Sequence, residues 1–170
     1  LAGEATLRFE AGPGGTYVDA GATCQDVFDG DLSNAIVVSG DVVDLAVLGT
    51  YQTIYNCEDL SGNAADPVTR TVIVLDATKP VITLAGESEL QFEATPAGTY
   101  LDAGATCQDL IDGELSNAIV VSGDVVNLAV PGTYQISYNC EDHSGNAADP
   151  VTRTVAVQDT TKPLITLVGE

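Results

Sequence analysis

The sequence contains the same segment twice. Leu1-Ala2-Gly3-Glu4 returns as Leu84-Ala85-Gly86-Glu87, and Cys24 returns as Cys107, with 107 − 24 = 83 residues between them. A third version of the tetrapeptide, Leu167-Val168-Gly169-Glu170, follows at the same spacing. A unit of this length is too long for a solenoid repeat and suits a small autonomous domain. We therefore expect two tandem domains, 1–77 (its opening strand incomplete) and 78–160, and then at 161–170 the opening strand of a following repeat.

Apolar residues alternate with polar ones in the manner of β-strands. Tyr134, Ile136, Tyr138 and Cys140 are separated by polar residues, which predicts a strand with one inward face. No segment carries a sustained helical period. Strands are expected at 7–10, 18–24, 35–38, 42–47, 51–57 and 68–74, with 81–84 opening the second copy. About seven short strands per repeat, separated by glycine-rich turns, predict an all-β fold of two tandem immunoglobulin-like β-sandwiches, end to end.

The cysteines fall at matched places in the two copies. Four cysteines allow three pairings, and identical units should form identical internal bonds, which gives Cys24–Cys57 and Cys107–Cys140. A loop of about 33 residues closed in this way stabilises a fold by roughly 3–4 kcal/mol. Tyr55 stands two residues before Cys57, the position of a tyrosine corner, in which the hydroxyl bonds to backbone. Persistent disulfides require an oxidising compartment, so an extracellular or cell-surface location is expected.

The charge of the chain excludes some partners. With 25 acidic and 5 basic residues the formal net charge is −20. Such a field repels nucleic acid and anionic membranes, and no apolar run is long enough to insert into a bilayer. We therefore expect no nucleic acid and no membrane insertion. Two interpretations of the acidity stay open, a solvated surface and specific cation binding.

Acidic residues gather at two turns that the repeats share. Carboxylates are the ligands that Ca²⁺ prefers, although the spacing is not that of an EF-hand loop. The alternative is a polar turn in which each aspartate bonds its own backbone. No cofactor is required by either interpretation, and Ca²⁺ is the ion that the pattern suits. The candidate ligands are Asp26, Asp29 and Asp31, their counterparts Asp109, Asp112 and Glu114, and a second set near the domain junction, Asp59 and Asp76.

Several strings resemble a known family. GTYVDAGAT at 15–23, DLSGNAA at 59–65 and TKPVIT at 78–83 are similar to the bacterial Ig-like repeats of surface and secreted proteins, which are related to HYR-type repeats. The resemblance covers the whole chain and implies a β-sandwich. It also implies a role as a stalk or spacer in adhesins, or as an accessory module beside secreted hydrolases. The paired cysteines depart from the commonest members.

The leading hypothesis is therefore a structural extracellular module that forms a rigid stalk, spacer or filament of an adhesin-like bacterial surface protein. The alternative is a binding module for surface polysaccharide or a partner protein, accessory to a secreted enzyme. An enzyme is not expected. His143 aligns with Leu60 of the first copy, so the repeats share no general base, and no Ser/His/Asp or Cys/His set can be assembled.

The expected partners are neighbouring identical repeats. In one interpretation the chain is a window on a longer array. In the other, the last strand completes the first sandwich of the next subunit and gives head-to-tail filaments by strand addition. The sequence by itself favours the window. The residues of the candidate polymer contact are Leu164, Ile165, Thr166 and Leu167.

Overall fold

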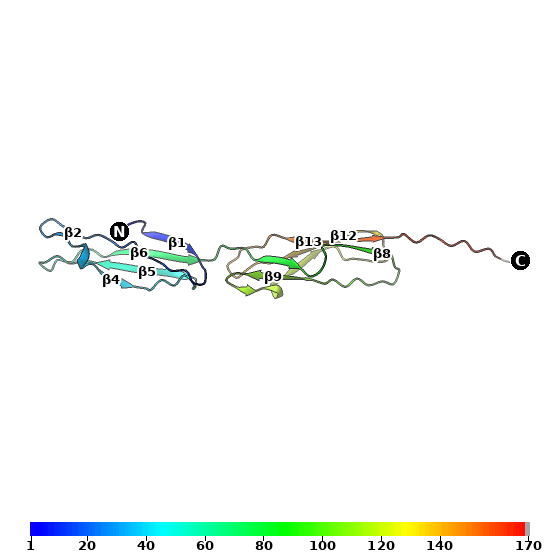
Figure 1. Ribbon diagram of the computed structural model, residues 1–170, viewed down its shortest axis with the longest axis horizontal. Coiled ribbons are helices and arrows are strands. Elements are labelled where there is room, and N and C mark those ends of the chain that lie inside the picture. Colours follow the sequence, from blue (N-terminus) through cyan, green and yellow to red (C-terminus); the bar gives the residue numbers. More distant parts are fainter. Residues whose placement is uncertain (169–170) are drawn as a thin grey trace. The chain divides into compact units, whose positions relative to one another are not determined.

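The computed structural model describes residues 1–168 and divides after Ala77 into two compact units. Each unit is built from strands, and each pairs a four-stranded sheet with a smaller one (Figure 1). The predicted all-β fold, with two immunoglobulin-like sandwiches in tandem, is confirmed. Among residues 1–168, no helix is long and apolar enough to cross a membrane.

In the first unit the larger sheet has the order β1-β6-β5-β4. The first and last of its strands in chain order, β1 and β6, are neighbours and run parallel, with Thr6 opposite Thr71 and Glu10 opposite Leu75. The other pairs in this sheet are antiparallel. The second sheet is a hairpin of two strands with two residues each. A short 3₁₀ turn, η1, follows it. The elements are β1 (Thr6–Glu10), β2 (Gln25–Asp26), β3 (Gly30–Asp31), η1 (Ser33–Ala35), β4 (Val37–Gly40), β5 (Gly49–Asn56) and β6 (Val68–Leu75).

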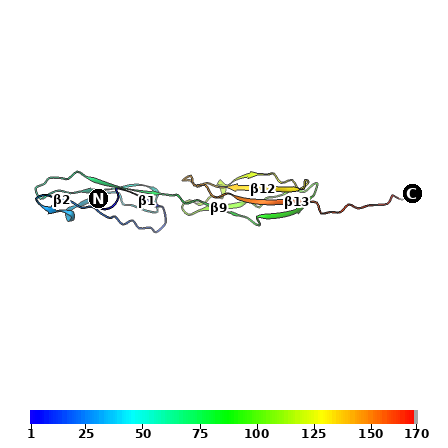
Figure 2. The same cartoon turned by 90° about the horizontal axis from the view of Figure 1, so that it is seen from above.

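The second unit repeats this plan with a more complete second sheet. Its larger sheet has the order β11-β12-β13-β8, and its smaller sheet the order β10-β9-β7. Figure 2 shows β9 in a different layer from β12. The elements are β7 (Val81–Leu84), β8 (Glu89–Glu93), β9 (Ala105–Asp109), β10 (Gly113–Glu114), η2 (Ser116–Ala118), β11 (Val120–Gly123), β12 (Gly132–Asn139) and β13 (Val151–Gln158).

The cores lie between the two sheets and follow the two-residue period of the strands. Val72 and Val74 on β6 are buried, as are Val155 and Val157 on β13. Each such buried valine stabilises the fold by roughly 1.5–3 kcal/mol. On β12, Ile136 and Tyr138 are buried, as the alternating pattern predicted.

Two predicted strands are wrong. Residues 42–47 form a turn, because the Asp44 carboxylate accepts the N–H of Ala46 at 2.9 Å and no neighbouring strand pairs with this segment. Residues 18–24 are not a strand in the first unit, where pairing begins at Gln25. Residues 161–168 lie outside any sheet, and residues 169 and 170 lie outside the described residues, so the opening strand of a following repeat at 161–170 stays a prediction.

Candidate functional site: the disulfide and the buried arginine

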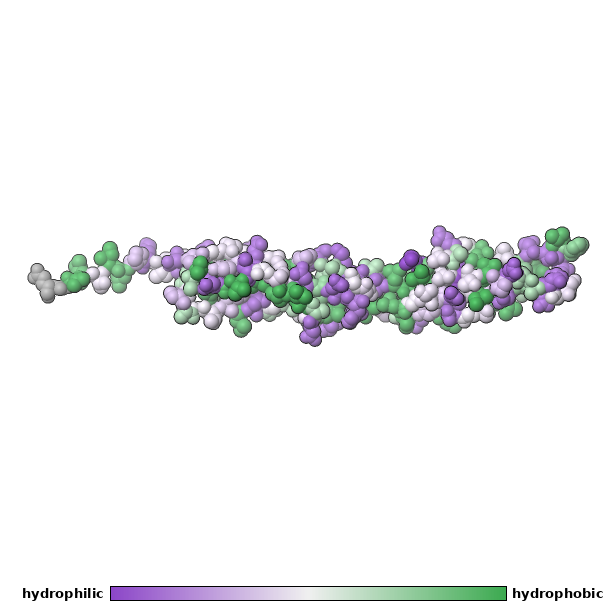
Figure 3. Space-filling model, turned by 180° about the vertical axis from the view of Figure 1, so that it is seen from behind, coloured by the Kyte–Doolittle hydropathy of each residue, from purple (hydrophilic) through white to green (hydrophobic). Residues whose placement is uncertain are grey.

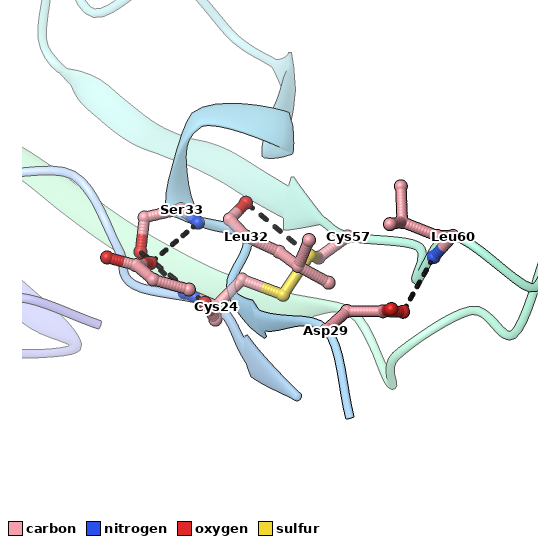
Figure 4. The surroundings of a disulfide bond; sticks show 7 residues. Cys24, Asp29, Leu32, Ser33, Cys57 and Leu60 are labelled. Atoms are coloured by element: carbon pink, nitrogen blue, oxygen red, sulfur yellow. Dashed lines mark hydrogen bonds between the residues drawn. A yellow bond between two sulfur atoms is a disulfide. The ribbon is translucent and has the colours of Figure 1, made fainter. Parts of the chain in front are cut away.

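A disulfide joins the two sheets of each unit. The bonds are Cys24–Cys57 and Cys107–Cys140, the two pairs expected from the repeat, with Cα–Cα distances of 6.5 and 6.6 Å. In the first unit, η1 backs the bond from one side (Figure 4). The Ser33 hydroxyl accepts the N–H of Cys24 at 3.1 Å, and the carbonyl oxygen of Leu32 lies 4.0 Å from the sulfur of Cys57. The bond therefore ties the start of β2 to the end of β5.

A buried arginine forms a second connection, which sequence reasoning missed. Arg70 lies on β6 in phase with Val72 and Val74, and its side chain is 0% exposed. Its guanidinium donates to Asp19 Oδ1 at 2.7 Å and to the carbonyl oxygen of Gly21 at 3.1 Å. Two further bonds reach the opening tetrapeptide, at the carbonyl oxygens of Glu4 (3.3 Å) and Ala2. Arg70 thus fastens the first residues of the repeat to its last strand.

The charge of Arg70 is balanced by a cluster around Asp19. The Tyr55 hydroxyl donates to Asp19 Oδ1 at 2.5 Å, and the Tyr17 hydroxyl donates to Oδ2 at 2.8 Å. The guanidinium carbon of Arg70 also lies 5.6 Å from the centre of the Tyr55 ring, within cation–π range. Because a buried charge is tolerated when it is paired and hydrogen-bonded, this network lets the sandwich hold an arginine at its centre.

The second unit builds the same cluster from the equivalent residues. Arg153 is 1% exposed and forms an ion pair with Asp102, which also accepts the Tyr138 hydroxyl at 2.5 Å. Its guanidinium donates to the carbonyl oxygens of Ala85 (2.5 Å) and Glu87 (3.1 Å). The tetrapeptide that returns in the sequence is therefore the loop that accepts the hydrogen bonds of the buried arginine.

Tyr55 does not form the predicted tyrosine corner. The Tyr55 hydroxyl donates to the Asp19 carboxylate instead of to backbone, since an ionised acceptor forms the stronger bond. Tyr51 makes the backbone contact, with its hydroxyl 2.9 Å from the carbonyl oxygen of Val47. Tyr134 repeats this contact with Val130 at the same distance.

The chain matches the family described as "Bacterial surface protein, Ig-like domain" over residues 1–74 and 82–157. The chain belongs to this family. The resemblance seen in the sequence is thereby confirmed, and each Ig-like repeat carries one disulfide and one buried arginine cluster.

Curated relatives are much longer than this chain. The chain is 25% identical over 135 residues to the pesticidal crystal protein Cry22Aa of Bacillus thuringiensis, a match that covers 79% of the chain and 18% of the relative. It is 33% identical over 128 residues to hyalin of Strongylocentrotus purpuratus, which covers 72% of the chain and 10% of hyalin. The chain thus spans less than a fifth of either relative.

Two solved structures are similar at lower identity. The lipoprotein BT2262 from Bacteroides thetaiotaomicron has 21% identity and a TM-score of 0.42, covering 49% of this chain and 40% of that one. The fibronectin(III)-like modules of CbhA from Clostridium thermocellum have 20% identity and a TM-score of 0.38, covering 97% and 96%.

Most carboxylates of the acidic turns accept hydrogen bonds from backbone N–H groups of the same turn. Asp26 Oδ1 accepts the N–H groups of Phe28 and Asp29, and Asp31 Oδ1 accepts that of Ser33. Asp59 binds the backbone and side chain of Asn63. In the second repeat Asp109 accepts the N–H groups of Ile111 and Asp112, and Glu114 accepts that of Ser116. Asp112 instead accepts the N–H of His143, which lies on another loop.

The bonds within one turn are those of polar turns, the alternative interpretation of the acidic pattern. Among the described residues of each unit taken by itself, no three carboxylates converge within 4.8 Å. Asp76 directly follows β6 and is buried. Calcium binding by the eight candidate ligands stays a prediction.

His143 supports a turn. Its backbone N–H donates to Asp112 Oδ2 at 2.8 Å, and Nδ1 lies 3.0 Å from Asp112 Oδ1. In the first repeat the N–H of Leu60 donates to Asp29 in the same way, at 3.1 Å (Figure 4). The backbone bond, which needs no imidazole, is the feature that both repeats share.

Acid should weaken the first repeat through Asp19. Burial by itself would raise the pKa of Asp19, but hydrogen bonds from Tyr55, Tyr17, the Gly21 N–H and Arg70 outweigh it and lower the pKa from 3.8 to about 2. A depressed carboxylate pKa stabilises the fold above its unfolded value, so this contribution is lost as the pH falls from about 4 through about 2. We expect a loss of about 2 kcal/mol, measured by urea unfolding across that range.

The control is Asp19→Asn, which removes the titrating group. Its free energy of unfolding should vary less with pH in that window than that of the parent chain. Equal pH slopes in the two proteins would contradict the assignment. The pKa of Asp102 is shifted downward as well, with burial opposing and the bonds from Tyr138, Tyr100 and Arg153 lowering it, so the second repeat should respond in the same direction.

Proposed function

We propose that the chain is a load-bearing spacer of a bacterial surface protein, acting outside the cytoplasm. The observation that carries this proposal is a parallel pair in the larger sheet of each sandwich, formed by the first and the last strand of that sheet in chain order. β1 and β6 are parallel neighbours over five residue pairs, and β8 and β13 are parallel neighbours in the same way. The family of bacterial surface proteins and the two disulfides support the location.

Such a parallel pair resists stretching in a particular geometry. A force applied to the two ends of a repeat pulls β1 and β6 in opposite directions along their length. All hydrogen bonds between the two strands are then loaded together in shear, instead of one after another as in a peeled hairpin. The bonds from Arg70 to Ala2 and Glu4 lie beside this pair and connect the residues before β1 to the start of β6. The first residues of the repeat, where a load from the preceding segment enters, are therefore held to β6.

The residues that follow the last strand of each repeat also form hydrogen bonds to the first strand of its larger sheet. Glu10, the last residue of β1, accepts the N–H of Ala77 at 2.9 Å. Glu93, the last residue of β8, accepts the N–H and hydroxyl of Thr160 at 2.8 and 2.7 Å and the hydroxyl of Thr161 at 2.8 Å. A spacer benefits from such bonds, because they limit the freedom of the residues that lead into the next repeat. A catalytic role is not part of the proposal.

Stretching experiments in two geometries test the proposal. The full chain is pulled in a force spectrometer either from its two ends or through handles on β4 and β5, which form an antiparallel pair that peels open. We expect unfolding from the ends to need a clearly higher force than peeling. Equal forces in the two geometries, or unfolding from the ends at the lowest measurable force, would contradict a load-bearing function.

One observation favours the second candidate, a binding module. Phe28 is 97% exposed, and Val27 beside it and Leu60 on the neighbouring loop are also exposed. The bond from the N–H of Leu60 to Asp29 joins the two loops, so the three apolar side chains share one end of the first repeat. Retention of the full chain on an immobilised polysaccharide or partner, lost in Phe28→Ala, would make binding the primary function.

A further inference from the structure

The larger sheet of each repeat has two edges, and in the second repeat these edges differ in chemistry. β8 forms one edge, and it begins and ends with a charged residue, Glu89 and Glu93. Charges on an edge strand oppose pairing with another chain. β11 forms the other edge, and its residues Val120–Gly123 carry no charge. β11 is therefore the edge that can accept a further strand.

Both faces of β11 present apolar side chains to solvent. Val120 and Val121 alternate between the two faces, and they are 64% and 56% exposed. A continuous apolar run is typical of a strand that is covered on both faces. The first repeat has the same run in β4, where Val37 and Val38 are 64% and 58% exposed. Figure 3 shows that apolar side chains, in green, reach the surface of both repeats among hydrophilic ones.

A groove lies beside the start of β11. It has a volume of about 700 Å³, and its lining includes Ala118, Val120, Asn139, Glu141 and Pro150. The first repeat has a groove of about 520 Å³ lined by the equivalent residues. In the second repeat the groove is present although the opening strand β7 is paired in its sheet, so the groove does not depend on that strand.

Carboxylates flank the apolar edge at both of its ends. Asp124 directly follows β11, Glu141 lines the groove at its start, and both residues are exposed. Lys79 lines the same groove, with its Nζ 2.8 Å from Asp149 Oδ1. A lysine side chain is thus accommodated beside this edge and finds a carboxylate there.

The first repeat has the same carboxylates, Asp41 and Glu58, at the two ends of β4. Its two basic residues lie elsewhere, because Arg8 is on β1 at the opposite edge and Arg70 is buried. The strand that complements this edge has an apolar centre and a cation at each end. A second copy of this chain carries the same net charge of −20 and would meet the edge with repulsion.

We propose that β4 and β11 each bind an extended segment of a partner protein that has an apolar centre and lysine or arginine at both ends. The segment adds a strand to the larger sheet through backbone hydrogen bonds. Its apolar side chains cover the exposed valines, and its cations pair with the flanking carboxylates. The inference does not depend on the spacer function, because the parallel pair stays at the other side of the sheet.

The strength of the contact follows from its size. Each edge strand has only four residues, so a single site is expected to bind weakly. Two identical edges in one chain raise the affinity for a partner that carries two such segments. Because the flanking charge pairs lie at the surface, salt should weaken the binding.

Titration of the full chain with a synthetic peptide, Lys-Thr-Val-Thr-Val-Thr-Lys, tests the proposal. Backbone amide chemical shifts measured by NMR report both the affinity and the place of binding. The amides of residues 37–40 and 120–123 should shift, while those of β1 and β8 should not. Raising the salt concentration to about 0.5 M should weaken the binding severalfold. Control peptides with glutamate in place of lysine, or with proline in place of valine, should not bind at these edges.

Charge reversal beside the edges provides matched variants. Glu58→Lys combined with Glu141→Lys should weaken the binding about fivefold or more, because each change replaces an attraction with a repulsion. Glu4→Lys combined with Glu87→Lys is the control. It changes the net charge equally at exposed residues that precede β1 and β8, and it should bind the peptide like the parent chain.

A third variant, Val38→Lys combined with Val121→Lys, places a charge on each edge and should abolish the binding. Both valines are exposed, so the variant should stay folded, which circular dichroism checks. Peptide shifts that avoid β4 and β11, or equal binding by the two glutamate variants, would overturn the proposal. Shifts at these edges that grow with chain concentration alone, and with salt, would assign the edges to a second copy and overturn it as well.

Discussion

Replacing Arg70 with alanine is expected to lower the free energy of unfolding of the first repeat by about 3–5 kcal/mol. The substitution leaves Asp19 charged and only partly exposed to solvent, without its guanidinium partner. It also removes the donors that reach Ala2, Glu4 and Gly21. Because small domains are stabilised by only about 5–15 kcal/mol, the first repeat should unfold in mild denaturant while the second stays folded.

Two further variants separate this network from a general effect of charge. Arg8 is an exposed residue of β1, and Arg8→Ala should change stability by no more than about 0.5 kcal/mol. Adding Asp19→Asn to Arg70→Ala should recover part of the loss, since no unpaired charge then remains in the cluster. If Arg70→Ala destabilised the repeat no more than Arg8→Ala, the cluster would not hold the sandwich together.

Removing one disulfide is the second large perturbation. In a chain with Cys24→Ala and Cys57→Ala, the first repeat should lose roughly 3–4 kcal/mol, because each bond closes a loop of 33 residues in the unfolded state. Chemical unfolding followed by fluorescence or circular dichroism should then show two transitions, with the intact second repeat unfolding last. A single unchanged transition would mean that the bond contributes little.

The strands that the sequence predicted well are those with one buried face. Ile136 and Tyr138 alternate with polar residues along β12 and are buried, so the residue types of this strand predict which face is inward. Residues 42–47 are rich in valine but form a turn, because a strand also needs a partner at its edge. Such a partner is a property of the sheet, which local composition does not show.

Arg70 was missed because charged residues are expected at the surface. Two signals were nevertheless present: Arg70 is in phase with Val72 and Val74, and both Arg70 and Asp19 return in the second copy as Arg153 and Asp102. Asp19 lies on a loop that is 51 residues from Arg70 in sequence. The pairing of distant charges can be seen only once the sandwich closes.

The central claim is that each repeat bears load between the two parallel strands of its larger sheet while the disulfide limits its extension. The most direct measurement is the length released when a single chain is stretched from its ends before and after reduction. The residues between Cys24 and Cys57 cannot extend while the bond is intact. Reduction should therefore lengthen each unfolded repeat by about 110 Å, given 33 residues at about 3.5 Å each, with both repeats responding alike. Equal released lengths before and after reduction would contradict the account.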